Sequence, residues 1–227
     1  MKKLAILLLA ASVSLSAQGK EEDRLRACGT VVTEILNMPD VPGDLLNRAE
    51  CVIVYPSVKK VALGVGGSYG RGAMTCRTGD NFTGPWSSPT LMALEGASIG
   101  LQIGGQSTDF VLLVMNDKGA MSVLSSKVKL GADASAAAGP KGRTAGAATD
   151  VAMKAEILTY SRTRGVFAGV SLEGSTLRPD EDGNKLVYGS AIAPRELVKG
   201  GVAVPSAAKS LVDVLNQRSP KNLSENK

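Results

Sequence analysis

Residues that could perform catalytic or metal chemistry are scarce in this sequence, which contains no histidine among its 227 residues. Without imidazole, Ser-His-Asp and Cys-His nucleophiles and histidine metal sites are excluded. Cysteines at positions 28, 51 and 76 do not have the spacing of a zinc knuckle. Ser107, Thr108 and Asp109 could form a hydrolytic cluster only with a base that the sequence does not show. We therefore expect a protein that is not an enzyme and that carries no cofactor or metal.

Two segments have compositions that could bind small ligands. The glycine-rich run 64–72, GVGGSYGRG, lacks the Gly-Lys-Ser/Thr ending of a phosphate-binding loop. Glycines inside strands mark bends or places where another backbone comes close, and we favour that interpretation. The acidic segment 180–184 resembles the start of a calcium loop, but Ala191 stands where the bidentate acid is needed. We expect an ordinary polar turn over 178–184.

Positive charge is the remaining candidate chemistry. Lysine and arginine number 26 against 21 acidic residues, a net charge of +5, and removing Lys2 and Lys3 with a leader leaves +3. That balance is too small for a dedicated nucleic-acid binder, and aromatic residues, at 4%, are too few for base stacking. If the basic residues converge they form a site for an anionic lipid surface; the alternative is a scattered, solvated surface. The candidate lipid-binding residues are Arg24, Arg26, Lys59, Lys60, Arg71, Lys127, Lys129, Arg162 and Arg164.

Residues 1–19 have the pattern of an export signal: two lysines, an apolar run from Leu4 to about Val13, then small residues. The apolar run is too short to span a membrane, and cleavage is expected after Ser16 or Gly19. We therefore expect an exported protein, periplasmic or extracellular, either free or associated with a membrane. Disulfides persist in such compartments.

Cys51 and Cys76 lie on candidate neighbouring strands, so we predict a disulfide between them. Cys28, on a predicted helix, is then the unpaired thiol. The alternative is three free buried thiols.

The hydrophobic pattern predicts one compact α+β domain dominated by antiparallel, glycine-rich strands with helices at its two ends. The helix over 21–38 should stop before Pro39, and its apolar stripe either packs on the domain or meets lipid beside Arg24 and Arg26. Trp86 is expected to cap the core. The other expected elements are a short helix within 40–50, two or three strands over 51–77, strands near 90–95, 98–104 and 109–115, a helix over 117–124, a strand-like run over 127–139, a hairpin turning at 162–165 and a helix over 206–217.

The order of these segments resembles the SYLF-domain family, through AECVIVYPSVKKVALGVGGSYGRG, then ALEGASIGLQIGGQSTDFVLLVMN, LGADASAAAGP and AEILTYSRTRGVFAGVSLEGSTLRPD. This lipid- and actin-binding module occurs in eukaryotic endocytic adaptors and in exported bacterial proteins. The match covers about residues 22–190. The expected organisation is a signal peptide (1–19), the SYLF-like domain (20–190), a C-terminal helical extension (191–217) and a disordered tail (218–227).

The resemblance implies binding of anionic phospholipids, through an amphipathic N-terminal helix and basic residues. Carried over by position, these are Arg24 and Arg26 on the helix and Lys59 and Lys60 after the first strand. The chain shows no adaptor domain, and export would separate it from cytoplasmic actin, so actin is not an expected partner. We expect an exported lipid-binding domain; the alternative is a cell-envelope structural or protein-interaction module without a lipid ligand.

Overall fold

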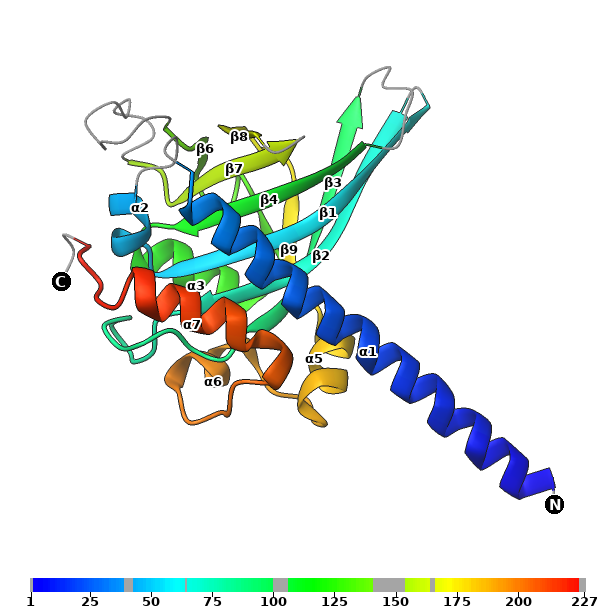
Figure 1. The fold of residues 1–227 in the computed structure, drawn as a ribbon. Helices are drawn as coiled ribbons and strands as arrows, with labels where there is room; N and C mark the ends of the chain where they lie inside the picture. Colours follow the sequence, from blue (N-terminus) through cyan, green and yellow to red (C-terminus); the bar gives the residue numbers. More distant parts are fainter. Residues whose placement is uncertain are drawn as a thin grey trace.

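The computed structural model describes residues 2–38, 43–63, 65–99, 106–140, 154–163 and 166–224, with the backbone alone for 2–15, 60–63, 65–66, 97–99, 106, 163 and 166. Within these ranges the chain forms one curled sheet, with helices from its two ends lying against one face (Figure 1). The expected α+β class is confirmed.

The described strands form a nine-stranded sheet in the order β5-β9-β3-β2-β1-β4-β7-β6, with β8 also paired to β7. Every pair is antiparallel except β6 with β7. The bounds are β1 Cys51–Leu63, β2 Val65–Cys76, β3 Thr90–Ile99, β4 Gln106–Val114, β5 Val128–Lys129, β6 Ala136–Ala138, β7 Ile157–Thr163, β8 Val166–Gly169 and β9 Thr176–Pro179. The first half of β1 and the second half of β4 are almost continuously apolar, because the sheet is covered on both faces along these two segments.

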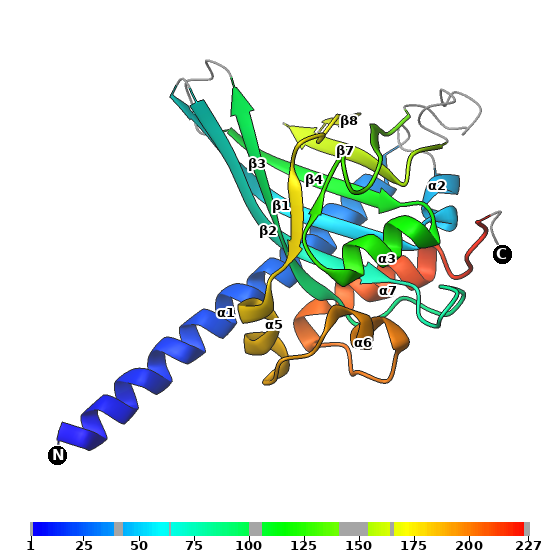
Figure 2. The same cartoon turned by 180° about the vertical axis from the view of Figure 1, so that it is seen from behind.

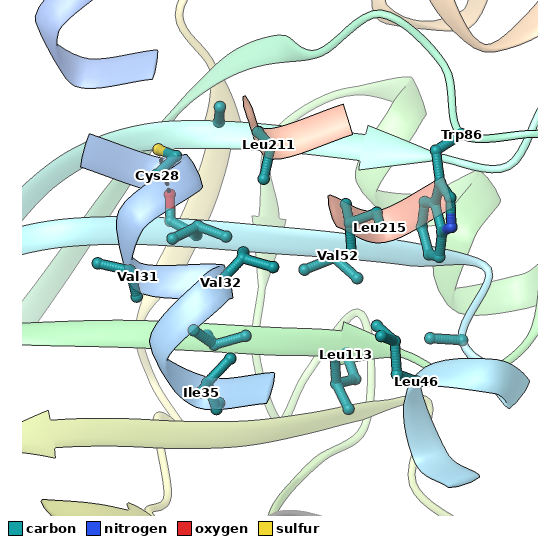
Figure 3. Close-up of a cluster of buried hydrophobic side chains, with 14 of the residues drawn as sticks. Cys28, Val31, Val32, Ile35, Leu46, Val52, Trp86, Leu113, Leu211 and Leu215 are labelled. Carbon is teal, nitrogen blue, oxygen red and sulfur yellow. Dashed lines mark hydrogen bonds between the residues drawn. The ribbon is translucent and has the colours of Figure 1, made fainter. Parts of the chain in front are cut away.

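One face of the sheet is covered by α1 (Lys2–Leu36) and α7 (Lys209–Arg218). The apolar stripe of α1 points at β1 and β4, where Cys28, Val32 and Ile35 pack with Val52 and Leu113 (Figure 3). Leu211 and Leu215 of α7 and Trp86 complete the same core. Packing on the domain, one of the two alternatives for this stripe, is confirmed, as is the core position of Trp86.

The opposite face carries a second core under α3 (Asp117–Ser125) and α6 (Pro194–Lys199), visible from behind in Figure 2. Ile53, Tyr55 and Phe110 pack there with Val123 of α3 and Val198 of α6. The described ranges also contain α2 (Gly43–Arg48), α5 (Glu181–Tyr188) and the short 3₁₀ turn η2 (Ser206–Ala208). None of the helices in the described ranges combines the length and hydropathy needed to cross a membrane.

The predicted disulfide is confirmed: Cys51 and Cys76 are register partners on β1 and β2 and are bonded, while Cys28 is a buried free thiol. The strand glycines also behave as expected. At Gly72 a Cβ atom would lie 1.8 Å from the carbonyl oxygen of Val54, so only glycine fits between the two strands.

Several predicted boundaries were wrong. Of the three strands expected over 90–115, the first and third correspond to β3 and β4. Gly96 pairs with Ser68, so β3 continues past it to Ile99, and residues 100–104 of the second expected strand lie outside the described ranges. Pro56, a residue type that commonly ends a strand, lies inside β1, which shifts register there and continues, since proline is tolerated at a bulge. The run 127–139 contains two short strands, β5 and β6, separated by a turn.

Two predictions near the C-terminus also need correction. The segment 178–184, expected to be a polar turn, contains the end of β9 and the start of α5. Asp180 caps this helix by accepting from the Gly183 N–H, and acids fill its first turn. The tail expected to be disordered from 218 is packed as far as 224: Ser219 is fully buried and Asn222 donates to Glu50. Residues 225–227 lie outside the described ranges.

Candidate functional site

Arg24 and Arg71, two of the predicted lipid-binding residues, lie in an internal network of charges that joins α1, β2 and the start of α5. Arg71 donates to Asp180 (Nε to Oδ2, 2.6 Å) and its Nη1 lies 3.1 Å from Glu21. Arg24 also pairs with Glu21, and its Nη1 lies 3.7 Å from Asp180. Glu21 and Asp180 are 3% and 7% exposed, so these arginines balance buried carboxylates of their own chain.

Arg26 and Arg162 are also paired within the chain. Arg26, exposed on α1, lies 2.9 Å from Asp23 and 3.1 Å from Glu22. Arg162 of β7 donates to Asp109 of β4 (2.7 Å), also pairs with Glu34 of α1 and lies over the ring of Phe167. Asp109, a member of the hydrolytic cluster considered above, therefore forms a structural ion pair with Arg162.

Among the other predicted basic residues, the sheet places two lysines at the same level. Lys59 of β1 is the register partner of Tyr69 on β2, and Tyr69 is in turn the partner of Glu95 on β3. Glu95 is the partner of Thr176 on β9, and Thr176 is the partner of Lys129 on β5. Residues directly opposite one another on adjacent strands share a face of the sheet. Lys59 and Lys129 therefore stand on one face, at the two ends of a single row, which we call the lysine row.

The side chains of the lysine row that are open to a ligand are Lys59 and Lys129, both exposed, and Tyr69, 49% exposed. Glu95 is engaged by Arg178 (2.8 Å). Neither lysine pairs with a carboxylate in the described ranges. The row therefore presents two positive charges and a tyrosine.

A groove of about 600 Å³ lies at the β5 end of the lysine row. Lys127 and Lys129 line it together with hydroxyl groups from Ser68 and Thr176. Its two acids are occupied: Glu95 by Arg178, and Asp133 by the backbone N–H of Lys129 (2.7 Å). Two lysines and two hydroxyl-bearing residues thus line the groove, a composition that suits an anionic group.

A second groove, of about 650 Å³, runs beside α1. Its walls include Lys20, Tyr69, Arg178 and Asp182, together with the charge network of Glu21, Arg71 and Asp180. Both signs of charge are mixed here, and most are already paired, so this groove has no selectivity for an anion. Among the described residues, no group of three or more cysteine or acidic side chains could hold a metal ion.

The structure thus places Lys59 and Lys129 in one row, with Lys127 beside Lys129 in the groove, and gives Arg24, Arg26, Arg71 and Arg162 partners within the chain. Only the backbone of Lys60 is described, and Arg164 lies outside the described residues. Tyr69 and Thr176 belong to this row but were not among the predicted residues. Register alone connects them to the lysines, and register across five strands cannot be read from the sequence.

Within the described ranges the chain is a mostly antiparallel sheet flanked by terminal helices, with two exposed lysines in one row across five of its strands. A family model described as Ysc84, Las17-binding protein actin regulator, matches residues 95–218. The chain belongs to this family, which confirms the SYLF resemblance.

Full-length relatives agree with this assignment. An SH3 domain-containing protein of Schizosaccharomyces pombe is 37% identical over 182 residues, covering 78% of this chain and 41% of the relative. LAS seventeen-binding protein 3 of Saccharomyces cerevisiae is 31% identical over 211 residues (91% and 45%), and human SH3 domain-containing YSC84-like protein 1 is 28% identical over 211 residues (92% and 60%). The chain thus spans roughly two to three fifths of the length of these relatives.

Proposed function

We propose that this domain is an exported, non-enzymatic module that binds anionic lipid surfaces through Lys59, Lys127 and Lys129. The observation that supports this most directly is the contrast between these lysines and the arginines. The arginines neutralise carboxylates of their own chain, whereas the three lysines are exposed and have no carboxylate partner in the described ranges. Their charge is available to a ligand outside the chain.

The strength of such binding follows from the number of free charges. A lysine near an anionic lipid surface contributes about 1 kcal/mol, so three lysines provide about 3 kcal/mol, roughly a hundredfold preference for anionic over neutral lipid. The attraction falls when salt shortens the Debye length from about 10 Å at 0.1 M to about 3 Å at 1 M. We therefore expect reversible, salt-sensitive binding.

Co-sedimentation with vesicles tests the proposal. The full chain, and the same chain beginning at Lys20, are mixed with neutral phosphatidylcholine vesicles or with vesicles containing phosphatidylglycerol, at about 0.1 M and about 1 M salt. Selective pelleting with anionic vesicles at low salt supports lipid binding. Equal pelleting with both lipids, or none with either, contradicts it.

The second candidate is a protein-interaction module of the cell envelope, favoured by the names of the relatives, which refer to binding of Las17. The sheet offers a physical basis for it: β9 pairs only with residues 92–95 of β3, so 96–99 form a strand edge without a partner in the described ranges. Such an edge can accept a strand from another protein. This version predicts a co-purifying partner and no response to lipid. Actin is not proposed for an exported chain.

A further inference from the structure

The central strands of the sheet extend beyond their outer neighbours. β9 accompanies β3 only as far as Glu95, and β7 accompanies β4 only from Asp109 onward. Past these points β3, β2 and β1 continue in register to Ile99, Val65 and Leu63. Figures 1 and 2 show this extension rising from the body, away from the helices. We call residues 61–63, 65–67 and 97–99 the arm.

The lysine row crosses the base of the arm, and the composition changes sharply beyond it. The nine arm residues are Val, Ala, Leu, Val, Gly, Gly, Ala, Ser and Ile, with no charge. Register places Val61, Gly67 and Ala97 in the next row on the face of Lys59, and Leu63, Val65 and Ile99 in the row after that. An uncharged end therefore follows directly on a row that holds Lys59 and exposed Tyr69.

This order of residues matches the order of zones in a bilayer. Tyrosine and lysine are the side chains that favour the level of the lipid headgroups, and uncharged apolar residues favour the hydrocarbon. Strand residues rise by about 3.3 Å each, so Leu63 lies about 13 Å beyond Lys59. The headgroup zone is about 5–8 Å deep in each leaflet. With Lys59 at the headgroups, the row of Leu63 reaches the hydrocarbon.

We propose that the arm enters the outer part of an anionic bilayer while Lys59 and Tyr69 remain among the headgroups. This inference rests on the proposed lipid binding and adds an apolar component to it. Within the described ranges, β2 of the arm is paired on both sides, whereas the outer edges of β1 at 61–63 and of β3 at 96–99 have no strand partner. These edges keep the insertion shallow, because unpaired backbone groups are costly in hydrocarbon. Binding should therefore retain a part that salt does not remove.

A fluorescent probe at the arm tests this directly. In the full chain, Leu63→Cys is labelled with an environment-sensitive NBD fluorophore; Cys51 and Cys76 are bonded and Cys28 is buried, so the new thiol is the accessible one. Gln217→Cys, on the exposed side of α7, is the matched control. With anionic vesicles we expect a blue shift and a several-fold rise in emission at position 63, quenched by nitroxides on the lipid chains, and no change at 217.

A second variant makes the test independent of the label. Ile99→Asp places a charge in the outermost described row and should weaken vesicle binding at least about tenfold, since burial of one such side chain is worth about 1.5–3 kcal/mol. Thermal unfolding should stay unchanged, because Ile99 lies in the outermost described row, past the ends of β7 and β9.

The outcomes separate the two proposals. Salt-sensitive pelleting with an unshifted probe at 63 overturns the insertion and leaves lipid binding intact. No pelleting with any vesicle overturns lipid binding itself. A blue shift that rises with protein concentration in the absence of lipid shows that a second copy covers the arm, and also overturns the insertion.

Discussion

Lys59 on β1 and Lys129 on β5 stand in one cross-strand row of the sheet, separated by Tyr69, Glu95 and Thr176. Three intervening strands bring together two lysines that are far apart in the chain. Both are exposed and neither pairs with a carboxylate in the described ranges. The row is therefore a product of the fold, and it supplies the positive face on which the proposed lipid binding depends.

Arg71 should contribute to the stability of the fold and not to lipid binding. Arg71→Gln removes contacts to the buried carboxylates of Glu21 and Asp180 and should lower the free energy of unfolding by about 2 kcal/mol, the range of charged hydrogen bonds. Vesicle binding of the folded variant should stay within twofold of the parent, measured by co-sedimentation beside urea unfolding. Arg26→Gln, at a residue exposed on α1, is the control and should change stability by less than about 0.5 kcal/mol. A selective loss of lipid binding in Arg71→Gln would show instead that Arg71 belongs to the lipid-binding site.

Arg77 is fully buried and ties the C-terminal segment to the sheet. It donates to the carbonyl of Ala49 (3.2 Å), to Ser219 Oγ (2.6 Å) and to the carbonyl of Lys221 (2.9 Å), and its guanidinium carbon lies 4.5 Å from the centre of the Trp86 ring. Burial lowers its pKa to about 10, against the opposing effect of Glu50.

Replacing Arg77 should strongly destabilise the fold. Arg77→Met removes the charge that balances the buried carboxylate of Glu50, so we expect a loss of about 3–5 kcal/mol in urea unfolding. A chain ending at Arg218, which lacks Ser219 and Lys221, should be destabilised as well. Arg195→Met, exposed on α6, is the matched control and should be neutral. A loss below about 1 kcal/mol for Arg77→Met would show that the segment is held by other contacts.

The sequence predicts this fold well where the physics is local. The β-branched run at 51–55 and the apolar stripe of 25–35 identify the core of the sheet and the face of α1, and the two strands around Gly64 place Cys51 opposite Cys76. The sequence does not predict that Arg71 and Arg77 are used in contacts within the chain, because their partners include residues 180 and 219–221, which are far away in the sequence. A basic residue in a sequence has the same appearance whether it neutralises a buried acid or faces solvent.

The disulfide should contribute to stability by limiting the unfolded chain. A loop of 25 residues predicts about 3 kcal/mol, so reductant should lower the free energy of unfolding by that amount. Cys76→Ser should be as unstable as the reduced protein and insensitive to reductant, while Cys28→Ala should keep the response. Burial raises the pKa of Cys28 to about 12, so this thiol should not react with alkylating reagents at pH 8 until the chain unfolds. Equal stability with and without reductant would contradict the assignment.

Glu156 should give the protein part of its sensitivity to acid. Its carboxylate accepts from the Ser135 N–H (2.8 Å) and pairs with Lys118 (2.6 Å). Burial alone raises the pKa of Glu156, but these partners outweigh it and the pKa is lowered. A lowered pKa in the folded state stabilises the protein above the unfolded value of about 4.3, and this contribution is lost as the pH falls through the folded pKa.

The corresponding experiment compares Glu156→Gln with the parent chain. We expect the variant to be less stable near pH 7 by about 1–2 kcal/mol and the difference to shrink below about pH 4. Glu196→Gln, at an exposed pair with Lys199, should show no such trend. A difference that stays constant from pH 7 to pH 3 would exclude a linked proton.

The lysine row and the groove at its β5 end could be predicted only in part. Lys59, Lys127 and Lys129 were named from their charge, but so were four arginines that the fold uses internally. The difference lies in the register of β5, β9 and β3, short strands whose pairing depends on contacts far apart in the sequence. Tyr69, which the same register exposes beside Lys59, gives no distinguishing signal within GVGGSYGRG.

The central claim, that the lysine row binds anionic lipid, is tested most directly by reversing its charge. Lys59→Glu with Lys129→Glu is compared with Lys185→Glu with Lys209→Glu, two exposed lysines of α5 and α7, by co-sedimentation with anionic vesicles at about 0.1 M salt. The net charge of the two proteins is the same. We predict that the row variant binds at least about 25-fold more weakly and the control within about threefold of the parent. Equal binding of the two variants would contradict the account.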